Sequence, residues 1–78
     1  MNRALCLTDL TPGQRCRVCS LAAQGTMRRR LLDLGFVEDT KVECVLCSPS
    51  GDPKAYLVRG AVIALRRQDS DSVLVEPL

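Results

Sequence analysis

Two cysteine pairs have the spacing of a metal site. Cys16 and Cys19 are separated by two residues, and the same spacing separates Cys44 and Cys47. In a zinc ribbon, two such pairs give four thiolates to one tetrahedral zinc ion. The chain of 78 residues contains no histidine, so the commonest metal ligand and the commonest general base are both missing. Ser-His and Cys-His nucleophile pairs are therefore excluded within one chain.

The elements predicted around these cysteines argue against a four-cysteine site. Residues 15–21 begin with polar and apolar residues in alternation, and residues 40–48 form a second predicted strand. Side chains three residues apart on a strand face opposite ways, so neither pair can converge on one ion without a turn. We expect one cysteine of each pair, Cys16 and Cys44, to be a small core residue.

The other cysteine of each pair leaves metal binding open. Cys19 and Cys47 are expected on the opposite face of their strands, partly exposed to solvent. A looser site that joins them to a carboxylate or to a second molecule would bind a transition metal, Fe²⁺ or Zn²⁺, weakly, while the fold is expected to require no cofactor. The odd count of five cysteines indicates reduced thiols, which are typical of a cytoplasmic protein.

A run of three arginines has the chemistry of anion recognition. Arg28, Arg29 and Arg30 carry planar guanidinium groups, which pair well with carboxylates and phosphates. We expect the run in the first turn of a helix, where the helix dipole makes cations mildly unfavourable, and such local conflicts are common at functional sites. One interpretation is that these arginines, together with Asp33, contact an acidic or phosphate-bearing partner. The other interpretation is that the arginines are solvated, or that they pair with acids of the same chain such as Asp33 or Glu38.

A single short helix is predicted to position these arginines. Thr26 is expected to cap it, because its hydroxyl can accept a free backbone N–H in the first turn. Met27, Leu31 and Leu34 follow at the spacing of one buried stripe. Gly35 stands where a left-handed C-terminal cap favours glycine.

The rest of the chain predicts short strands at roughly ten-residue spacing. Turns and loops rich in glycine, proline and aspartate separate them. The pattern predicts a mainly β fold, a small closed or nearly closed barrel of about five strands with one short α-helix, in a single domain over residues 1–78. The predicted strands cover residues 15–21, 40–48, 55–59, 62–66 and 72–76.

One loop is a second candidate for a partner contact. Gly51, Asp52 and Pro53 lie between two predicted strands. Glycine and proline shape turns on their own account, but loops on a rigid scaffold also carry binding residues. Both interpretations stay open.

The overall composition excludes several classes of function. A net charge of +2 is too small for the electrostatic footprint of a strong nucleic-acid binder, and only Phe36 and Tyr56 are aromatic. No run approaches the ~18 apolar residues of a membrane helix, so the chain is not expected to be embedded in a membrane. It has no glycine-rich phosphate loop, so it cannot be a GTPase, and we expect no enzymatic activity. A homo-oligomer is left open, because short barrels have edge strands that can pair between chains.

Several segments together resemble the FeoA family. None of them is specific alone, but they occur in the family's order and spacing over nearly the whole chain. One matches the family's helix-and-glycine motif, and others match its N-terminal segment, its central loop and its closing strands. The matching segments are residues 29–36, residues 7–13, residues 50–53 followed by Tyr56 and Val58, and residues 62–66 with 73–75.

The resemblance implies an SH3-like barrel and a cytoplasmic accessory protein of bacterial ferrous-iron uptake. The implied partner is FeoB, the membrane permease that carries a cytoplasmic GTP-binding domain. Kinship with the SH3-like C-terminal domain of DtxR-type repressors makes a regulator module an alternative, and a small zinc-binding protein that uses the cysteine pairs is another. The family often has Pro-Gly after the helix, where this chain has Glu38 and Asp39, so we expect a type I turn.

Overall fold

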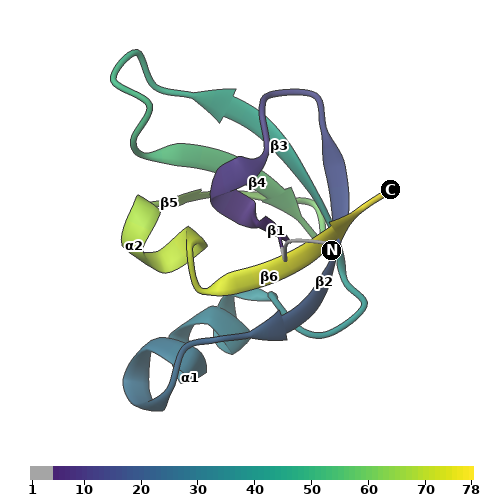
Figure 1. Cartoon of the computed structure of the whole chain (residues 1–78), viewed down its shortest axis with the longest axis vertical. Helices are drawn as coiled ribbons and strands as arrows, with labels where there is room; N and C mark the ends of the chain where they lie inside the picture. Colours follow the sequence, from purple (N-terminus) through teal and green to yellow (C-terminus); the bar gives the residue numbers. More distant parts are fainter. Residues whose placement is uncertain (1–4) are drawn as a thin grey trace.

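The computed structural model describes residues 5–78, most of which belong to one antiparallel sheet that curls into a barrel (Figure 1). The strands follow the order β1-β6-β2-β3-β4-β5, and every neighbouring pair is antiparallel. Their bounds are Leu5–Cys6 for β1, Arg15–Leu21 for β2, Lys41–Cys47 for β3, Lys54–Val58 for β4, Ala61–Leu65 for β5 and Val73–Pro77 for β6. The predicted mainly β barrel is confirmed. The additional strand, β1, has two residues, too few for an alternating pattern to reveal.

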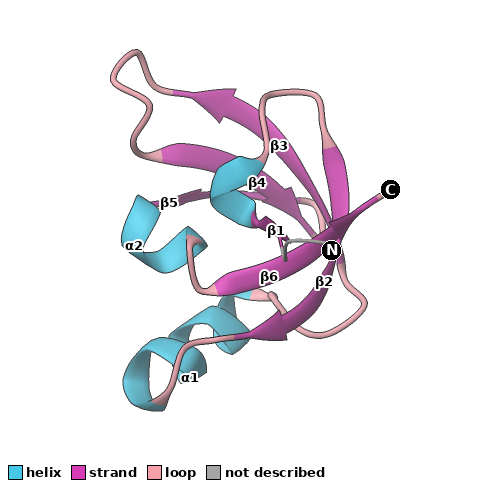
Figure 2. Cartoon of the chain, viewed as in Figure 1, coloured by secondary structure: helices cyan, strands magenta, loops and turns pink. Residues whose placement is uncertain are grey.

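Three helical segments join the strands of the described chain, and Figure 2 shows their places. The principal helix α1 spans Gly25–Leu34, a 3-10 turn η1 spans Leu7–Asp9, and a short helix α2 spans Arg67–Ser70, where the sequence predicted only a turn. Within residues 5–78 no helix has the length and apolar character needed to cross a membrane. Each of the three segments connects two strands that are consecutive in the chain.

The buried stripe predicted for α1 is confirmed. Leu31 is buried, and Met27 and Leu34 are half-buried against the core. Gly35 ends the helix with a φ of 111°, the left-handed conformation that favours glycine. A Cβ atom at Gly35 would also lie 3.1 Å from a methyl group of Val58, so glycine lets the helix end approach β4 closely.

The start of α1 differs from the prediction. Gln24 is the N-cap residue and makes no side-chain capping bond, and the helix begins at Gly25, so the predicted cap by Thr26 is wrong. The arginine run consequently extends beyond the first turn. The interaction of Arg29 and Arg30 with the helix dipole is weaker there, because the dipole effect fades after the first turn.

The turn after α1 is also different from the prediction. Asp39 has a φ of 71°, and the N–H of Thr40 donates to the carbonyl oxygen of Val37 over 3.1 Å. A positive φ at the third turn position belongs to a type II turn, so the predicted type I turn is wrong. Aspartate tolerates this conformation better than most residues, which is why the turn forms without glycine.

The core fills the interior of the barrel. Inward residues alternate along the strands with exposed ones, as in β2, where Cys16 and Val18 are buried between exposed neighbours. Tyr56 donates a hydrogen bond from its hydroxyl to the carbonyl oxygen of Leu7 over 3.1 Å, and Lys54 donates from Nζ to Thr8 and Leu10 carbonyl oxygens at 2.8 Å each. These bonds fasten η1 to β4. The buried hydrophobic residues are Leu7, Leu10, Cys16, Val18, Ala23, Leu31, Phe36, Val42, Cys44, Tyr56, Val58, Leu65, Val73 and Val75.

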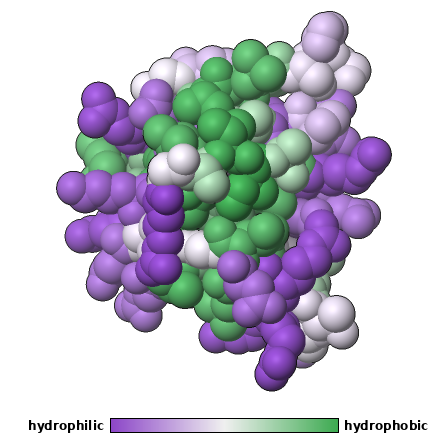
Figure 3. Space-filling view, turned by 180° about the vertical axis from the view of Figure 1, so that it is seen from behind, coloured by the Kyte–Doolittle hydropathy of each residue, from purple (hydrophilic) through white to green (hydrophobic). Residues whose placement is uncertain are grey.

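One outer face of the barrel is apolar. Figure 3 views the molecule from the side on which β5 lies and shows a band of hydrophobic residues with hydrophilic residues on both sides. Leu46 on β3 and Val62 on β5 are each 64% exposed. This face of the sheet is therefore not covered by any other element among residues 5–78.

Candidate partner-binding surfaces

The exposed side of α1 carries a shallow hollow with a cationic rim. Gly25, Arg28, Arg29, Leu32 and Asp33 line it, and it has a volume of about 460 Å³. Both arginines are exposed, and no ion pair between residues of the described chain involves either of them. Leu32 is 36% exposed and adds an apolar contact. We call these five residues the helix surface; it combines two free guanidinium groups with a small apolar patch.

Arg30 belongs to a different interaction. Its Nη2 atom donates to Oδ2 of Asp69 on α2 over 2.9 Å, and Asp69 is only 3% exposed. The other oxygen of that carboxylate, Oδ1, is buried and has no hydrogen-bond partner among residues 5–78. Arg30 thus links α1 to α2, and its partner is neither Asp33 nor Glu38. The sequence could not indicate this pair, because its members are 39 positions apart.

The second predicted contact, the loop at residues 51–53, is also tied to α2. Oδ1 of Asp52 accepts a hydrogen bond from the backbone N–H of Arg67 over 2.8 Å. Gly51 has a φ of 87°, which suits glycine, and Pro53 is exposed. Figure 1 shows this loop, which joins β3 to β4, at the opposite end of the molecule from α1. The predicted partner-binding residues therefore fall on two separate surfaces.

The cysteine pairs divide between core and surface. Cys16 and Cys44 are buried, which confirms their prediction as core residues. Burial raises the pKa of the Cys16 thiol to about 11 and also raises the pKa of the Cys44 thiol. A buried thiol that stays protonated is a poor metal ligand, because the thiolate is the ligand form.

The structure does not bring Cys19 and Cys47 together. Arg17 on β2 is opposite Lys41, the first residue of β3, and Cys19 lies two positions beyond Arg17, whereas Cys47 ends β3. The length of β3 consequently separates the two cysteines. Over residues 5–78, no three Cys, Asp or Glu side chains gather as the ligands of one metal ion would. Metal binding through Cys19 or Cys47 stays a prediction that needs a ligand from elsewhere.

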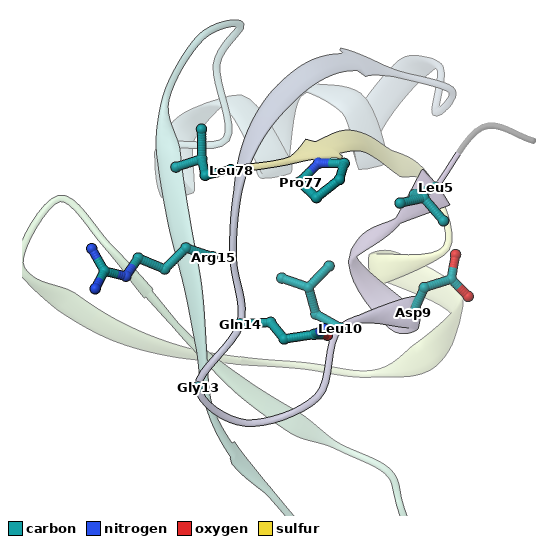
Figure 4. A pocket seen from close by; sticks show the side chains of 8 residues that line it. All are labelled: Leu5, Asp9, Leu10, Gly13, Gln14, Arg15, Pro77 and Leu78. Atoms are coloured by element: carbon teal, nitrogen blue, oxygen red, sulfur yellow. The ribbon is translucent and has the colours of Figure 1, made fainter. Parts of the chain in front are cut away.

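A further hollow lies where the two ends of the described chain meet (Figure 4). It has a volume of about 650 Å³ and an open mouth. Figure 4 shows Leu5, Leu10 and Pro77 around it, while the charged ends of Asp9 and Arg15 extend away. No sequence pattern indicated this hollow, because it forms only when η1 and β6 come together. Its lining residues are Leu5, Asp9, Leu10, Gly13, Gln14, Arg15, Pro77 and Leu78.

A small barrel of six antiparallel strands with one principal helix, α1, defines the class as an SH3-like domain. The family model described as the FeoA domain matches residues 5–77, and the chain belongs to the FeoA family. A curated relative is the Fe(2+) transport protein A/Fe(2+) transporter FeoB fusion protein of Porphyromonas gingivalis (strain ATCC BAA-308 / W83). It is 31% identical over 70 residues, which are 90% of this chain and 8% of the relative. The chain thus spans only a small part of that relative's length.

Solved structures share the fold over nearly the whole chain. Iron(II) transport protein A from Clostridium thermocellum has a TM-score of 0.91 at 31% identity and covers 95% of this chain and 46% of its own. Stenotrophomonas maltophilia FeoA, solved with zinc and described as a prokaryotic SH3 domain protein, has a TM-score of 0.84 at 31% identity over 94% of this chain and 91% of its own. A manganese-dependent transcriptional repressor matches 100% of this chain and 38% of its own with a TM-score of 0.87, and its 17% identity shows the fold alone.

Proposed function

We propose that this protein is a cytoplasmic accessory protein of ferrous-iron uptake, which acts by contact with a FeoB-like permease and its GTP-binding domain. It carries out no catalytic step itself. The observation that carries the proposal is the Porphyromonas gingivalis relative, in which a domain 31% identical to this chain belongs to a protein named as a fusion with FeoB. A covalent link keeps two modules at high effective concentration, which favours a contact between them even when each contact is weak.

The helix surface is the best candidate for this contact. Arg28 and Arg29 are exposed and free of ion pairs within residues 5–78, so their guanidinium groups can reach carboxylates or phosphates of a partner. Leu32 lies in the same hollow and supplies an apolar contact beside the charges. Arginine is one of the residue types enriched among those that dominate binding energy at protein interfaces. Arg30 contributes indirectly, because its pairing with Asp69 holds α1 in place.

The proposal is tested by the double variant Arg28→Ser and Arg29→Ser. We expect its affinity for the purified cytoplasmic domain of the FeoB-like permease, measured by isothermal titration calorimetry, to fall about tenfold or more, since two interface arginines are lost. Its stability should stay within about 0.5 kcal/mol of the parent, because both side chains are exposed. Iron uptake in cells that carry the variant should fall as well.

The matched control removes two positive charges from another surface. Arg15→Ser with Lys41→Ser alters two exposed residues on β2 and β3, neither of which lines the helix surface. This control should retain the parent's affinity for the permease domain. Equal weakening by both double variants would indicate an unspecific charge effect, and unchanged binding by the α1 variant would refute the helix surface as the contact.

A further inference from the structure

Strand β5 forms an open edge of the sheet. Within residues 5–78 it pairs with β4 alone, and the strand order ends with it. The opposite edge strand, β1, has two residues, whereas β5 has five. Its residues, Ala61–Leu65, include no charge and no proline, which are the features that usually protect an edge from pairing with another chain.

The hairpin between β4 and β5 determines where the backbone groups of β5 point. Val58 lies opposite Ala61, and the two residues between them, Arg59 and Gly60, have φ values of 50° and 82°. Positive φ at both positions identifies a two-residue turn of the I′ type. In such a hairpin the closing pair exchanges both hydrogen bonds, and bonded and non-bonded pairs alternate from there along the strands.

This alternation directs two residues of β5 toward the open edge. Val62, opposite Leu57, and Ala64, opposite Ala55, occupy the non-bonded pairs, so their N–H and C=O groups point away from β4. Outside the β4–β5 ladder, no backbone hydrogen bond within residues 5–78 reaches either residue. The edge therefore presents two donors and two acceptors in the spacing that a further strand requires.

The side chains beside this edge are apolar and exposed. Val62 and Ala64 point to the outer face, where Leu46 lies opposite Ala55 and Ala55 lies opposite Ala64. Val62 and Leu46 are each 64% exposed, and Leu57 is half-buried. Figure 3 shows a band of hydrophobic residues on the side of the molecule on which β5 lies. A strand added at the edge would extend the sheet and bury part of it.

Positive charges lie at both ends of β5 and indicate which kind of strand the open edge would bind. Arg59 precedes the strand and Arg66 and Arg67 follow it, and all three are exposed. If two copies paired antiparallel about Ile63, Arg59 in the turn of each copy would come near Arg66 and Arg67 at the far end of β5 of the other. Like charges brought close together in this way repel each other, so a second copy is disfavoured. A strand with acidic residues at both ends is complementary instead.

We propose that β5 is a strand-addition site, at which an extended segment of a partner protein with an apolar centre and acidic ends joins the free edge of the barrel. Main-chain hydrogen bonds to Val62 and Ala64 supply the pairing, and the arginines at the two ends supply the selectivity. The site is separate from the helix surface and does not depend on which protein contacts α1. If the test contradicted strand addition at β5, the proposed function would still stand.

A synthetic peptide of about nine residues serves as the probe, with alternating Val and Thr between two Glu residues at each end. The full chain should bind it, and hydrogen exchange measured by NMR should show new protection at the amides of Val62 and Ala64. Val62→Pro removes one outward N–H without breaking a bond to β4, and proline is tolerated at such edge positions. We expect this variant to bind the peptide about tenfold or more weakly, since a main-chain hydrogen bond and the fit of the strand are lost.

Two controls separate strand pairing from unspecific attraction. Val62→Thr retains the N–H and should keep affinity within about threefold of the parent. The same peptide with Lys in place of Glu should bind about tenfold or more weakly to the parent, and Arg59→Glu with Arg66→Glu should reverse this preference even if Val62→Pro fails to fold. Equal binding of both peptides to the parent would overturn the proposal. So would protection of Val62 and Ala64 in the peptide-free chain through a dimer.

Discussion

At the scale of single residues, Cys16 and Tyr56 show what burial in the barrel does to ionisable groups. Burial raises the pKa of the Cys16 thiol from its ordinary 9.0 to about 11, and the nearby Cys19 and Cys44 thiols act in the same direction. Burial also raises the pKa of the Tyr56 phenol from 10.0 to about 12, against the opposite effect of a hydrogen bond with Ser70. Both groups are therefore neutral in the folded protein over the whole physiological range.

These shifts predict that the protein loses stability in alkaline solution. Above pH 9 the unfolded chain releases the Cys16 proton while the native state still holds it, so the unfolded state is favoured. The contribution of Cys16 to the free energy of unfolding is fully present below pH 9 and is lost progressively as the pH rises toward about 11. Tyr56 adds the same trend between pH 10 and about 12. Urea unfolding in reducing buffer at a series of pH values measures the slope.

The variant Cys16→Val isolates the contribution of the thiol. It removes the titrating group and keeps a small apolar side chain in the core, so the loss of stability just above pH 9 should become shallower. Cys19→Ser, at an exposed position, should keep the slope of the parent. Identical slopes for Cys16→Val and the parent would show that Cys16 does not titrate as its burial implies.

At the scale of elements, the junction between α1 and α2 depends on one ion pair. Asp69 is almost completely buried, and Arg30 supplies its only ion pair within residues 5–78. A buried carboxylate that loses its cation is costly, because neither water nor another charge compensates it. The side chain of Arg30 is 62% exposed, which moderates the effect through solvent screening. The pair therefore positions the helix surface without being part of it.

Replacement of Arg30 by methionine should destabilise the fold by about 1–3 kcal/mol, because Asp69 is left without its partner. In an Asp69→Asn background the same replacement should cost less than about 0.5 kcal/mol. Arg28→Met, on the free side of the helix, should change stability by at most about 0.5 kcal/mol. Chemical denaturation of the parent, Arg30→Met, Asp69→Asn and the double variant gives the coupling energy between Arg30 and Asp69. Equal costs for Arg28→Met and Arg30→Met would contradict a structural role of the pair.

At the scale of the whole molecule, the barrel is held together by its own core. The interior is filled by apolar side chains, and η1 is fastened to β4 by the hydrogen bonds of Lys54 and Tyr56. Cys16 and Cys44 take part in this core as small apolar residues. Stability is therefore expected to arise from hydrophobic burial and hydrogen bonding, with no contribution from a bound metal.

Dialysis against a chelator should leave the thermal unfolding midpoint unchanged within about 1 °C, because a 1 kcal/mol loss would shift a domain of this size by several degrees. Differential scanning calorimetry before and after dialysis gives the comparison. Added Zn²⁺ or Fe²⁺ should bind weakly. The double variant Cys19→Ser with Cys47→Ser should bind the added metal ion more weakly still if these thiols are the ligands. One tightly bound zinc ion per chain, found by metal analysis of protein purified without added metal, would overturn this prediction.

Local sequence patterns were sufficient to predict most elements of the fold. The bounds of β2 at residues 15–21 were predicted fully, because alternating polarity is a property of the strand itself. The left-handed end of α1 at Gly35 was also predictable, because it depends only on the backbone preference of glycine itself. The short strand β1 and the start of α1 were not, because their extents depend on pairing and packing with distant residues.

The candidate surfaces depended more on tertiary contacts. The sequence by itself determined that the chain has two cysteines suited to a core, a cationic helix and no histidine, because these follow from residue types and period-two spacing. Only the tertiary structure decided that Arg30 is bound to Asp69, that Cys19 and Cys47 lie apart, and that β5 is an open edge between arginines. The physical reason is that ion pairs, ligand sets and sheet edges are formed by residues far apart in the chain, which only the folded barrel brings together or separates.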